Sequence, residues 1–144
     1  MWVIYAFIAA LLWGLDYALT EKVLNRITFS TLLSIELFFG LLGMLLLGLL
    51  RGTYWKDWSV ILSSQKIIWH VVIIVLVFNI ANTFIVLSIG NKNATLAGLI
   101  EISYPLFIAV FSWFLFKESH VNLWTGIGAV LVFSGIGLIY YVNK

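Results

Sequence analysis

Residues 67–88 have the sequence IIWHVVIIVLVFNIANTFIVLS, a run of 22 residues without Lys, Arg, Asp or Glu. A helix of roughly 20 apolar residues is long enough to cross the hydrocarbon core of a bilayer, which is about 30 Å thick. This run is therefore typical of a transmembrane helix. Windows of the same length and character lie on both sides of it, which indicates that the chain is a membrane protein.

Five such windows account for most of the chain. We expect transmembrane helices at Trp2–Thr20, Ser30–Leu50, Ile67–Ser88, Ala94–Phe116 and Val121–Val142. The connections between them are short and leave no room for a soluble domain. The predicted fold class is an all-α integral membrane protein, in which residues 1–144 form a single transmembrane domain. No basic residue precedes the first window and no small-residue cleavage site follows it, so we expect a mature helix rather than a signal peptide.

The composition argues against several classes of protein. Hydrophobic residues make up 63% of the sequence and charged residues 10%, whereas soluble domains have roughly 45–50% and about 25%. Lys and Arg occur singly, without the basic patch that is typical of nucleic-acid binding. There is no Cys, and His70 and His120 lie far apart, so we expect no metal site and no cofactor. No nucleophile–base pair is apparent, so we do not expect an enzyme.

The longest connection, Arg51–Lys66, has aromatic residues at an amphipathic spacing. Trp and Tyr concentrate at the boundary between lipid and water. Tyr54, Trp55 and Trp58 therefore indicate a short segment that lies on the membrane surface.

Small residues mark helix faces that can pack closely. In the first span they recur every four residues, the small-xxx-small pattern of contacting membrane helices, at Ala6, Ala10, Gly14 and Ala18. The last span carries several glycines and no charge. We expect it to pack against another helix or another subunit.

Three carboxylates lie inside the predicted spans, at Asp16, Glu36 and Glu101, whereas no span contains Lys or Arg. Each carboxylate costs about 2.5–3.5 kcal/mol at a helix centre if it is charged and unpaired. These groups must therefore face water, a cation or one another, or carry a proton. Carboxylates in this environment are suited to binding and releasing protons. Alternatively, each lies close enough to a helix end to reach the lipid headgroups.

The positions of the polar residues suggest that they lie at one depth. Asp16, Glu36, Asn82 and Glu101 are each four to seven residues from a span end, and all four ends lie on the same side of the membrane. With a rise of about 1.5 Å per residue, they form a layer roughly 6–10 Å below one surface. Four polar groups at one depth predict a binding site.

Several neighbours of this layer are candidate cavity residues. Asn79, Asn82 and Thr83 share one face of the third span, either as cavity lining or as interhelical hydrogen-bonding groups. Aromatic walls around a cation are expected from Trp13, Tyr17 and Tyr104, which would otherwise contact lipid or pack between helices.

Pro105, the single proline of the chain, predicts a kink beside Glu101. Proline has no N–H, so the carbonyl of the residue four positions earlier, Glu101, loses its helical hydrogen bond. Such a carbonyl is tolerated at membrane depth where it is buried in protein or lines a cavity. The kink either serves helix packing alone, or it also opens a polar site at Glu101.

The sequence also resembles a known family of membrane proteins. The motifs that carry the resemblance run from the first helix to the last: Ala9-Ala10-Leu11-Leu12-Trp13-Gly14 with Lys22, then Glu101, Pro105, Leu106 and Phe107, then Phe116-Lys117-Glu118, and finally Trp124 and Gly126. Their order and spacing are similar to the EamA domain of the drug/metabolite transporter (DMT) superfamily, over the whole chain as one five-helix unit. The resemblance implies a secondary transporter of metabolites, amino acids or drugs. Full-length members usually carry two such units in opposite orientation, so a single unit implies a dimer.

The carboxylates and the resemblance together predict a proton-coupled secondary transporter of a small cationic or zwitterionic metabolite or drug. We expect it to work as a homodimer by alternating access. Glu101 is the first candidate for proton or substrate coupling, Asp16 is the second, and Glu36 belongs to the same group. The expected location is the plasma membrane of a prokaryotic cell, with protons, a small-molecule substrate and the lipid bilayer as partners. The alternative is a non-transporting scaffold or accessory subunit, for example for a lipid-linked intermediate.

The distribution of Lys and Arg predicts how the chain inserts. One side of the membrane receives Arg51, Lys56, Lys66 and Lys117, and the other side receives Lys22, Arg26, Lys92 and Lys144. Because the bias in Lys and Arg sets the direction of insertion, an equal count favours dual topology and an antiparallel dimer. Alternatively, a partner or an uneven weighting of the loops fixes one orientation.

Overall fold

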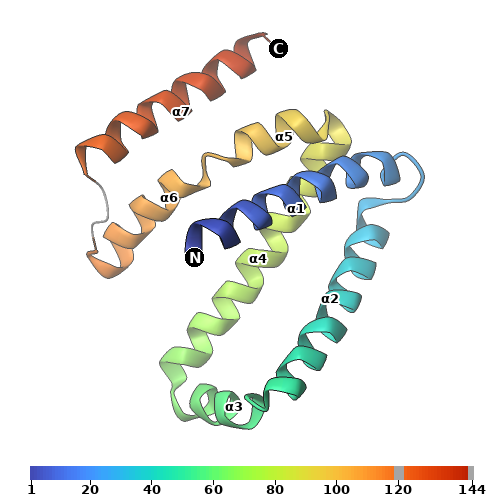
Figure 1. Cartoon of the computed structure of the whole chain (residues 1–144), viewed down its shortest axis with the longest axis vertical. Helices are drawn as coiled ribbons and strands as arrows, with labels where there is room; N and C mark the ends of the chain where they lie inside the picture. The colour runs from blue at the N-terminus through green and yellow to red at the C-terminus, as the bar shows by residue number, and fades with distance from the viewer. Residues whose placement is uncertain (119–121, 143–144) are drawn as a thin grey trace.

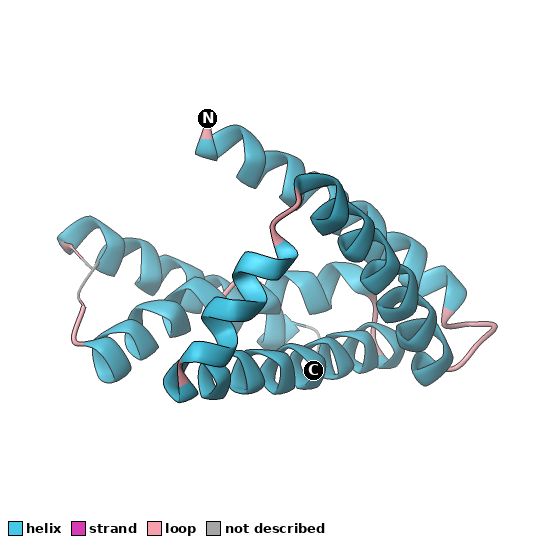
Figure 2. Cartoon of the chain, turned by 90° about the horizontal axis from the view of Figure 1, so that it is seen from below, coloured by secondary structure: helices cyan, strands magenta, loops and turns pink. Residues whose placement is uncertain are grey.

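The computed structural model describes residues 1–118 and 122–142, which form helices joined by short connections. Their order is α1 (Trp2–Val23), α2 (Phe29–Arg51), α3 (Tyr54–Ser63), α4 (Gln65–Asn91), α5 (Ala94–Glu101), α6 (Tyr104–Phe111), η1 (Ser112–Phe116) and α7 (Leu123–Val142). Figure 1 shows α1 crossing the upper part of the molecule, while α2 and α4 run down from it and meet at α3. Within the described residues there is no β-strand, as the view in Figure 2 makes plain.

Five helical segments are long and apolar enough to cross a membrane. They are α1, α2, α4, the segment Ala94–Phe116 that comprises α5, α6 and η1, and α7. The prediction of an all-α membrane protein with five transmembrane helices is thereby confirmed.

Helices α1, α2 and α4 run past the ends of the predicted spans, because hydropathy marks the depth of the hydrocarbon core rather than the end of the helix. The first helix was predicted to end at Thr20 and continues to Val23, and the third was predicted to end at Ser88 and continues to Asn91. The predicted start of the last span at Val121 lies outside the described residues, as do His120 and Lys144.

The connection between α2 and α4 contains the short helix α3. Its first residue, Tyr54, turns back onto α2 and donates a hydrogen bond from its hydroxyl to the carbonyl oxygen of Met44 at 2.8 Å. Gly48 makes room for this ring, since a Cβ at that position would overlap it. Trp55, by contrast, is 88% exposed. Tyr54 thus ties the segment to α2, while Trp55 is free to contact the membrane interface.

The buried core is small and lies where α4, α5 and the C-terminal end of α1 meet. Ile89 is only 1% exposed, and it packs with the buried Ala94 and Ala97 of α5. Small residues in α5 let this helix approach α4 closely, as is usual between membrane helices. At this end of the molecule the three helices pack together, and we call it the closed end.

Two side chains cap the start of α5 at this closed end. The Oδ1 atom of Asn93 accepts from the Leu96 N–H at 2.8 Å, and the Oε2 atom of Glu21 accepts from the Ala94 N–H at 2.7 Å. The first N–H groups of a helix have no partner within the helix, so these bonds satisfy donors that would otherwise be unpaired. Because Glu21 belongs to α1, its bond also joins α1 to the turn between α4 and α5.

Removal of the Glu21 carboxylate is expected to loosen this end. Glu21→Ala should lower the midpoint of thermal unfolding in detergent by a few degrees, because the Ala94 N–H loses its acceptor. Glu21→Gln keeps an oxygen atom at the same place and should unfold near the wild-type temperature. Arg26→Ala, which removes an exposed basic side chain just after α1, serves as the control. An unchanged midpoint for Glu21→Ala would show that this contact does not hold the closed end together.

Most other large apolar side chains are exposed, including those along α2 and α7. In water this arrangement would be unstable, but lipid tails are as apolar as leucine, so the exposure carries no hydrophobic penalty in a bilayer. The glycines of α7 have nothing within 4 Å of an added Cβ, at Gly126, Gly128, Gly135 and Gly137. Gly126 and Gly137 lie on one face of α7, and Gly128 and Gly135 lie on the opposite face, so neither face is occupied near these glycines within the described chain.

Candidate functional site

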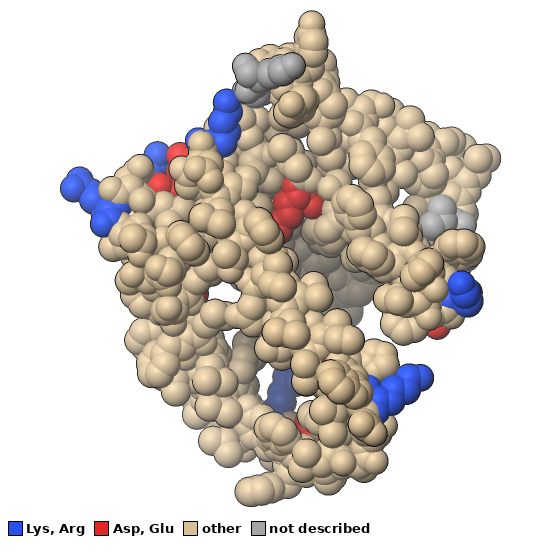
Figure 3. Space-filling model, turned by 180° about the vertical axis from the view of Figure 1, so that it is seen from behind, with Lys and Arg blue, Asp and Glu red and all other residues tan. Residues whose placement is uncertain are grey.

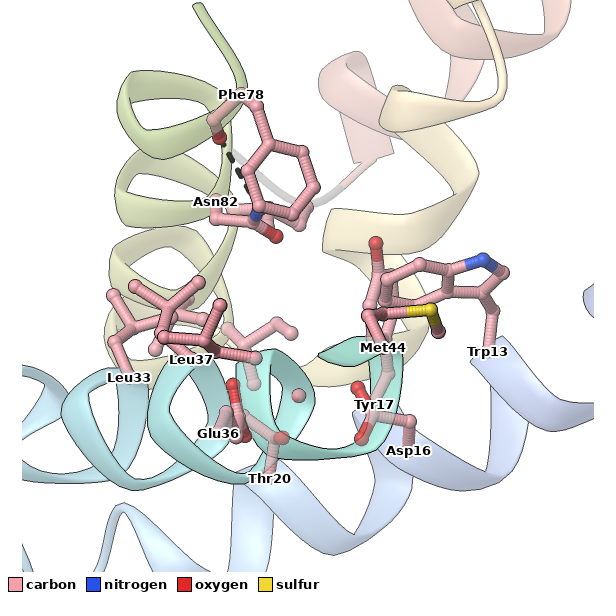
Figure 4. A pocket seen from close by; sticks show the side chains of 15 residues that line it. Trp13, Asp16, Tyr17, Thr20, Leu33, Glu36, Leu37, Met44, Phe78 and Asn82 are labelled. Atoms are coloured by element: carbon pink, nitrogen blue, oxygen red, sulfur yellow. Dashed lines mark hydrogen bonds between the residues drawn. The ribbon is translucent and has the colours of Figure 1, made fainter. Parts of the chain in front are cut away.

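A cavity of about 560 Å³ lies between α1, α2 and α4, and we call it the first cavity. It is lined by Trp13, Asp16, Tyr17, Thr20, Leu33, Glu36, Leu37, Gly40, Leu41, Met44, Phe78, Asn82, Ile85, Val86 and Ile89. Figure 4 shows Asp16 and Thr20 on α1 and Glu36 on α2 close together at its floor, with Asn82 of α4 across the space. Two carboxylates thus share a space whose other walls are mainly apolar.

A second cavity, of about 470 Å³, lies between α1, α4, α5 and the start of α6. It is lined by Ala10, Trp13, Gly14, Tyr17, Phe78, Ala81, Asn82, Ile85, Gly98, Glu101, Ile102 and Tyr104. Five of these residues also line the first cavity, namely Trp13, Tyr17, Phe78, Asn82 and Ile85. The two cavities are therefore neighbours with a common wall, and each contains at least one carboxylate.

The predicted layer of four polar residues is brought together around these cavities. Asp16 and Glu36 line the first cavity, Glu101 lines the second, and Asn82 lines both. The three predicted aromatic residues are also present, because Trp13 and Tyr17 belong to the common wall and Tyr104 lines the second cavity.

Tyr17 joins the common wall to Glu101. Its hydroxyl donates a hydrogen bond to the Oε2 atom of Glu101 at 2.6 Å. Its ring meets Trp13 edge to face, with the two ring centroids 5.7 Å apart. Sequence reasoning identified both Tyr17 and Glu101 but missed the bond between them, since the residues are 84 positions apart and no local pattern connects them.

The helix that carries Glu101 is interrupted directly after it. Helix α5 ends at Glu101, Ile102 and Ser103 form a turn, and α6 begins at Tyr104 with Pro105 in its first turn. The sequence predicts a kink at Pro105, and the structure interrupts the helix just before it, at Ile102 and Ser103, whose backbone keeps right-handed helical angles. Proline fits the first turn of a helix, where its missing N–H costs nothing.

Asn79 and Thr83 lie apart from both cavities. They line a separate shallow pocket with Ile80 and Phe84. Their polar atoms bond to their own helix, because Asn79 donates to the Val75 carbonyl oxygen and Thr83 to that of Asn79, each at 2.8 Å. Successive helical residues are rotated by about 100°, so Thr83 faces a different direction from Asn82. The expected shared face of Asn79, Asn82 and Thr83 is thus split between two surfaces.

The charges around the cavities are of one sign. Among the described residues, no Lys or Arg lines either cavity. Figure 3 shows acidic side chains within the hollow between the helices, while most of the basic side chains visible in that view lie at the periphery. The site is suited to a proton or to a ligand with positive charge.

One family model matches this chain. It is that of the EamA-like transporter family, and it covers residues 1–141. Neither the curated proteins nor the solved structures contain a significant match. The matched range includes the first four long helices completely, α7 up to Tyr141, and every residue of both cavities.

Proposed function

Because the chain belongs to the EamA-like transporter family of the DMT superfamily, we propose that it is a proton-coupled secondary transporter of a small cationic or zwitterionic metabolite or drug. It acts as a homodimer by alternating access in the plasma membrane of a prokaryotic cell, where a proton gradient is available. Membership of the family makes it a membrane transporter, and the class of substrate, the coupling ion and the dimer are the parts that we propose.

The observation that carries the proposal is the set of three carboxylates around two adjoining cavities. Asp16, Glu36 and Glu101 line these spaces without a basic residue among the described lining residues. An ionised carboxylate at membrane depth is costly unless a positive partner compensates it. A substrate cation or a proton supplies that partner. Aromatic rings of Trp13 and Tyr17 in the common wall add favourable contacts for an organic cation.

Competition for the same carboxylates supplies the coupling. A proton that binds Glu101 removes the charge that holds a cation, so the two ligands occupy the site in turn. We assign the first role to Glu101, which is half-buried and lies at the break between α5 and α6. Asp16 is the second candidate, and Glu36 shares the first cavity with it.

The homodimer supplies the second unit that alternating access requires. Glycines on α2 and α7 that line neither cavity have open space where a Cβ would be, at Gly43, Gly126, Gly128, Gly135 and Gly137. Such surfaces allow close contact with helices of a second copy. The equal count of Lys and Arg on the two sides favours an antiparallel arrangement, which places one set of cavities in each half of the membrane.

A pair of ligands with the same shape and opposite charge tests the substrate class. Purified protein in liposomes is expected to take up phenethylammonium at a rate at least tenfold above that for phenylacetate. The reason is that the cavity carboxylates attract the cation and repel the anion. The measurement is uptake of each labelled compound into vesicles, with protein-free vesicles as the control.

The same experiment separates the proposal from the alternative of a scaffold. A transporter moves solute without any other chain, whereas a scaffold or accessory subunit gives the rate of empty vesicles for both compounds. Selective uptake of phenylacetate, or of a phosphorylated or dicarboxylate solute, contradicts the proposed charge preference.

A further inference from the structure

Tyr17 lies in the common wall between the two cavities. Among the residues that the structure describes, it is the only one that lines both cavities and also bonds to one of their carboxylates. The other four residues of the common wall have no hydrogen bond to a carboxylate. Tyr17 is therefore more than an aromatic surface for a cation.

The ring of Tyr17 is fixed by contacts on several sides. Trp13, one turn earlier on α1, meets it edge to face. On α5 it lies over Gly98, where a Cβ would be 3.5 Å from the ring. The aromatic ring also packs against the small buried core at the closed end. These contacts direct the hydroxyl along α5 from Gly98 to Glu101, one turn further on.

The bond between the two side chains has the geometry of a strong interaction. The distance of 2.6 Å between the Tyr17 hydroxyl and the Glu101 Oε2 atom lies in the range of about 2.5–2.7 Å for hydroxyl groups that donate to ionised carboxylates. A carboxylate has two oxygen atoms and can accept several hydrogen bonds. The Oε2 atom of Glu101 is bonded to Tyr17 of α1, so its other oxygen atom, Oε1, can bind a ligand in the second cavity.

We propose that Tyr17 is the positioning residue of the Glu101 site, an inference that rests on the proposed function. Its hydroxyl holds the carboxylate in the orientation that receives the substrate cation. A flexible glutamate side chain loses conformational freedom when it binds a ligand. The bond from Tyr17 imposes that loss before the substrate arrives, which increases affinity by preorganisation. The hydroxyl contacts the carboxylate and acts on the substrate through it, whereas the ring can contact an organic cation directly.

Tyr17→Phe tests this role because it removes the hydroxyl and keeps the ring packed against Trp13 and Gly98. Calorimetric titration of purified protein with phenethylammonium is expected to give a dissociation constant about tenfold higher than wild type. The KM for uptake should rise similarly while kcat is unchanged, as expected for loss of binding in the ground state. Tyr5→Phe, the same change at an exposed tyrosine of α1 outside both cavities, should match wild type.

A double-mutant cycle shows whether the hydroxyl acts through Glu101. Glu101→Asp keeps the charge but withdraws the carboxylate by one methylene, out of reach of Tyr17. On its own it should weaken binding to the same degree as Tyr17→Phe, and the double variant should bind no more weakly than either single variant. Glu101→Asp also tests the contact by itself if Tyr17→Phe does not fold.

The possible outcomes are distinct. Wild-type affinity in Tyr17→Phe and in Glu101→Asp overturns the positioning role while the proposed function stands. A tenfold loss from Tyr17→Phe that recurs in full in the Glu101→Asp background also overturns it, because the hydroxyl then contacts the ligand directly. Absence of phenethylammonium binding to the wild-type protein overturns the proposed function, and the role of Tyr17 falls with it.

Discussion

Glu101→Gln is expected to reduce proton-driven flux to the level of protein-free vesicles. Glutamine has nearly the same shape as glutamate and fills the same part of the second cavity, but it cannot bind and release a proton near neutral pH. The measurement is substrate uptake into proteoliposomes with an imposed pH gradient, together with an internal pH-sensitive dye. Exchange of labelled for unlabelled substrate without a gradient is also expected to weaken at low substrate concentration, because glutamine lacks the charge that holds the cation.

The matched control for this variant is Asp57→Asn. It makes the same chemical change on the exposed surface of α3, outside both cavities, and should leave proton-driven flux unchanged. The folding of both variants is checked by their unfolding midpoints. Full proton-coupled activity in Glu101→Gln would exclude this residue from coupling and would make Asp16 the leading candidate.

We expect two variants, each with a pair of added lysines, to be inactive when each is expressed alone and to regain transport when they are co-expressed. Asn25→Lys with Asn91→Lys adds two positive charges to one side, and Thr53→Lys with Ser59→Lys adds two to the other, so each pair changes an even count of four against four into six against four. Each pair should fix one orientation, and the two orientations are opposite. If the active dimer is antiparallel, each variant alone gives background uptake in cells and co-expression restores uptake.

The controls replace the same residues with glutamine, which adds no charge and should leave activity near wild type. Labelling of a single cysteine introduced at Asp57 in intact cells reports the orientation of each variant. If both lysine variants are active alone, the active dimer is not antiparallel. If only one is active and co-expression adds nothing, the chain works in a single orientation.

The number and type of the helices follow directly from the sequence because the bilayer imposes a length and an apolar character on each span. The continuation of α1 through Glu21 to Val23 could not be read in the same way. Glu21 lies in this continuation and caps α5, and its partner, Ala94, is 73 positions away in the sequence. The break after Glu101 was visible only as a proline, which signals an irregularity without fixing how far the chain departs from the helix.

The sequence predicts which polar residues lie at similar heights along their helices, but not the direction in which each side chain points. The constant rise per residue of a helix places Asp16, Glu36 and Glu101 at similar distances from one surface, and the structure brings them around two adjoining cavities. Rotation of each helix about its own axis depends on packing with other helices, which the sequence does not show. For that reason Asn82 and Thr83, adjacent in sequence, belong to different surfaces.

The break between α5 and α6 also gives the second cavity an electrostatic property that is independent of any side chain. An α-helix carries a macrodipole, with a partial negative charge equivalent to roughly half an elementary charge at its C-terminus. Helix α5 ends at Glu101 and α6 begins at Tyr104, and both residues line the second cavity, so the negative pole of one helix and the positive pole of the next lie beside it. When a proton neutralises Glu101, the backbone retains this pair of poles. A zwitterion, which carries both signs of charge, is therefore matched by the backbone in either protonation state of Glu101.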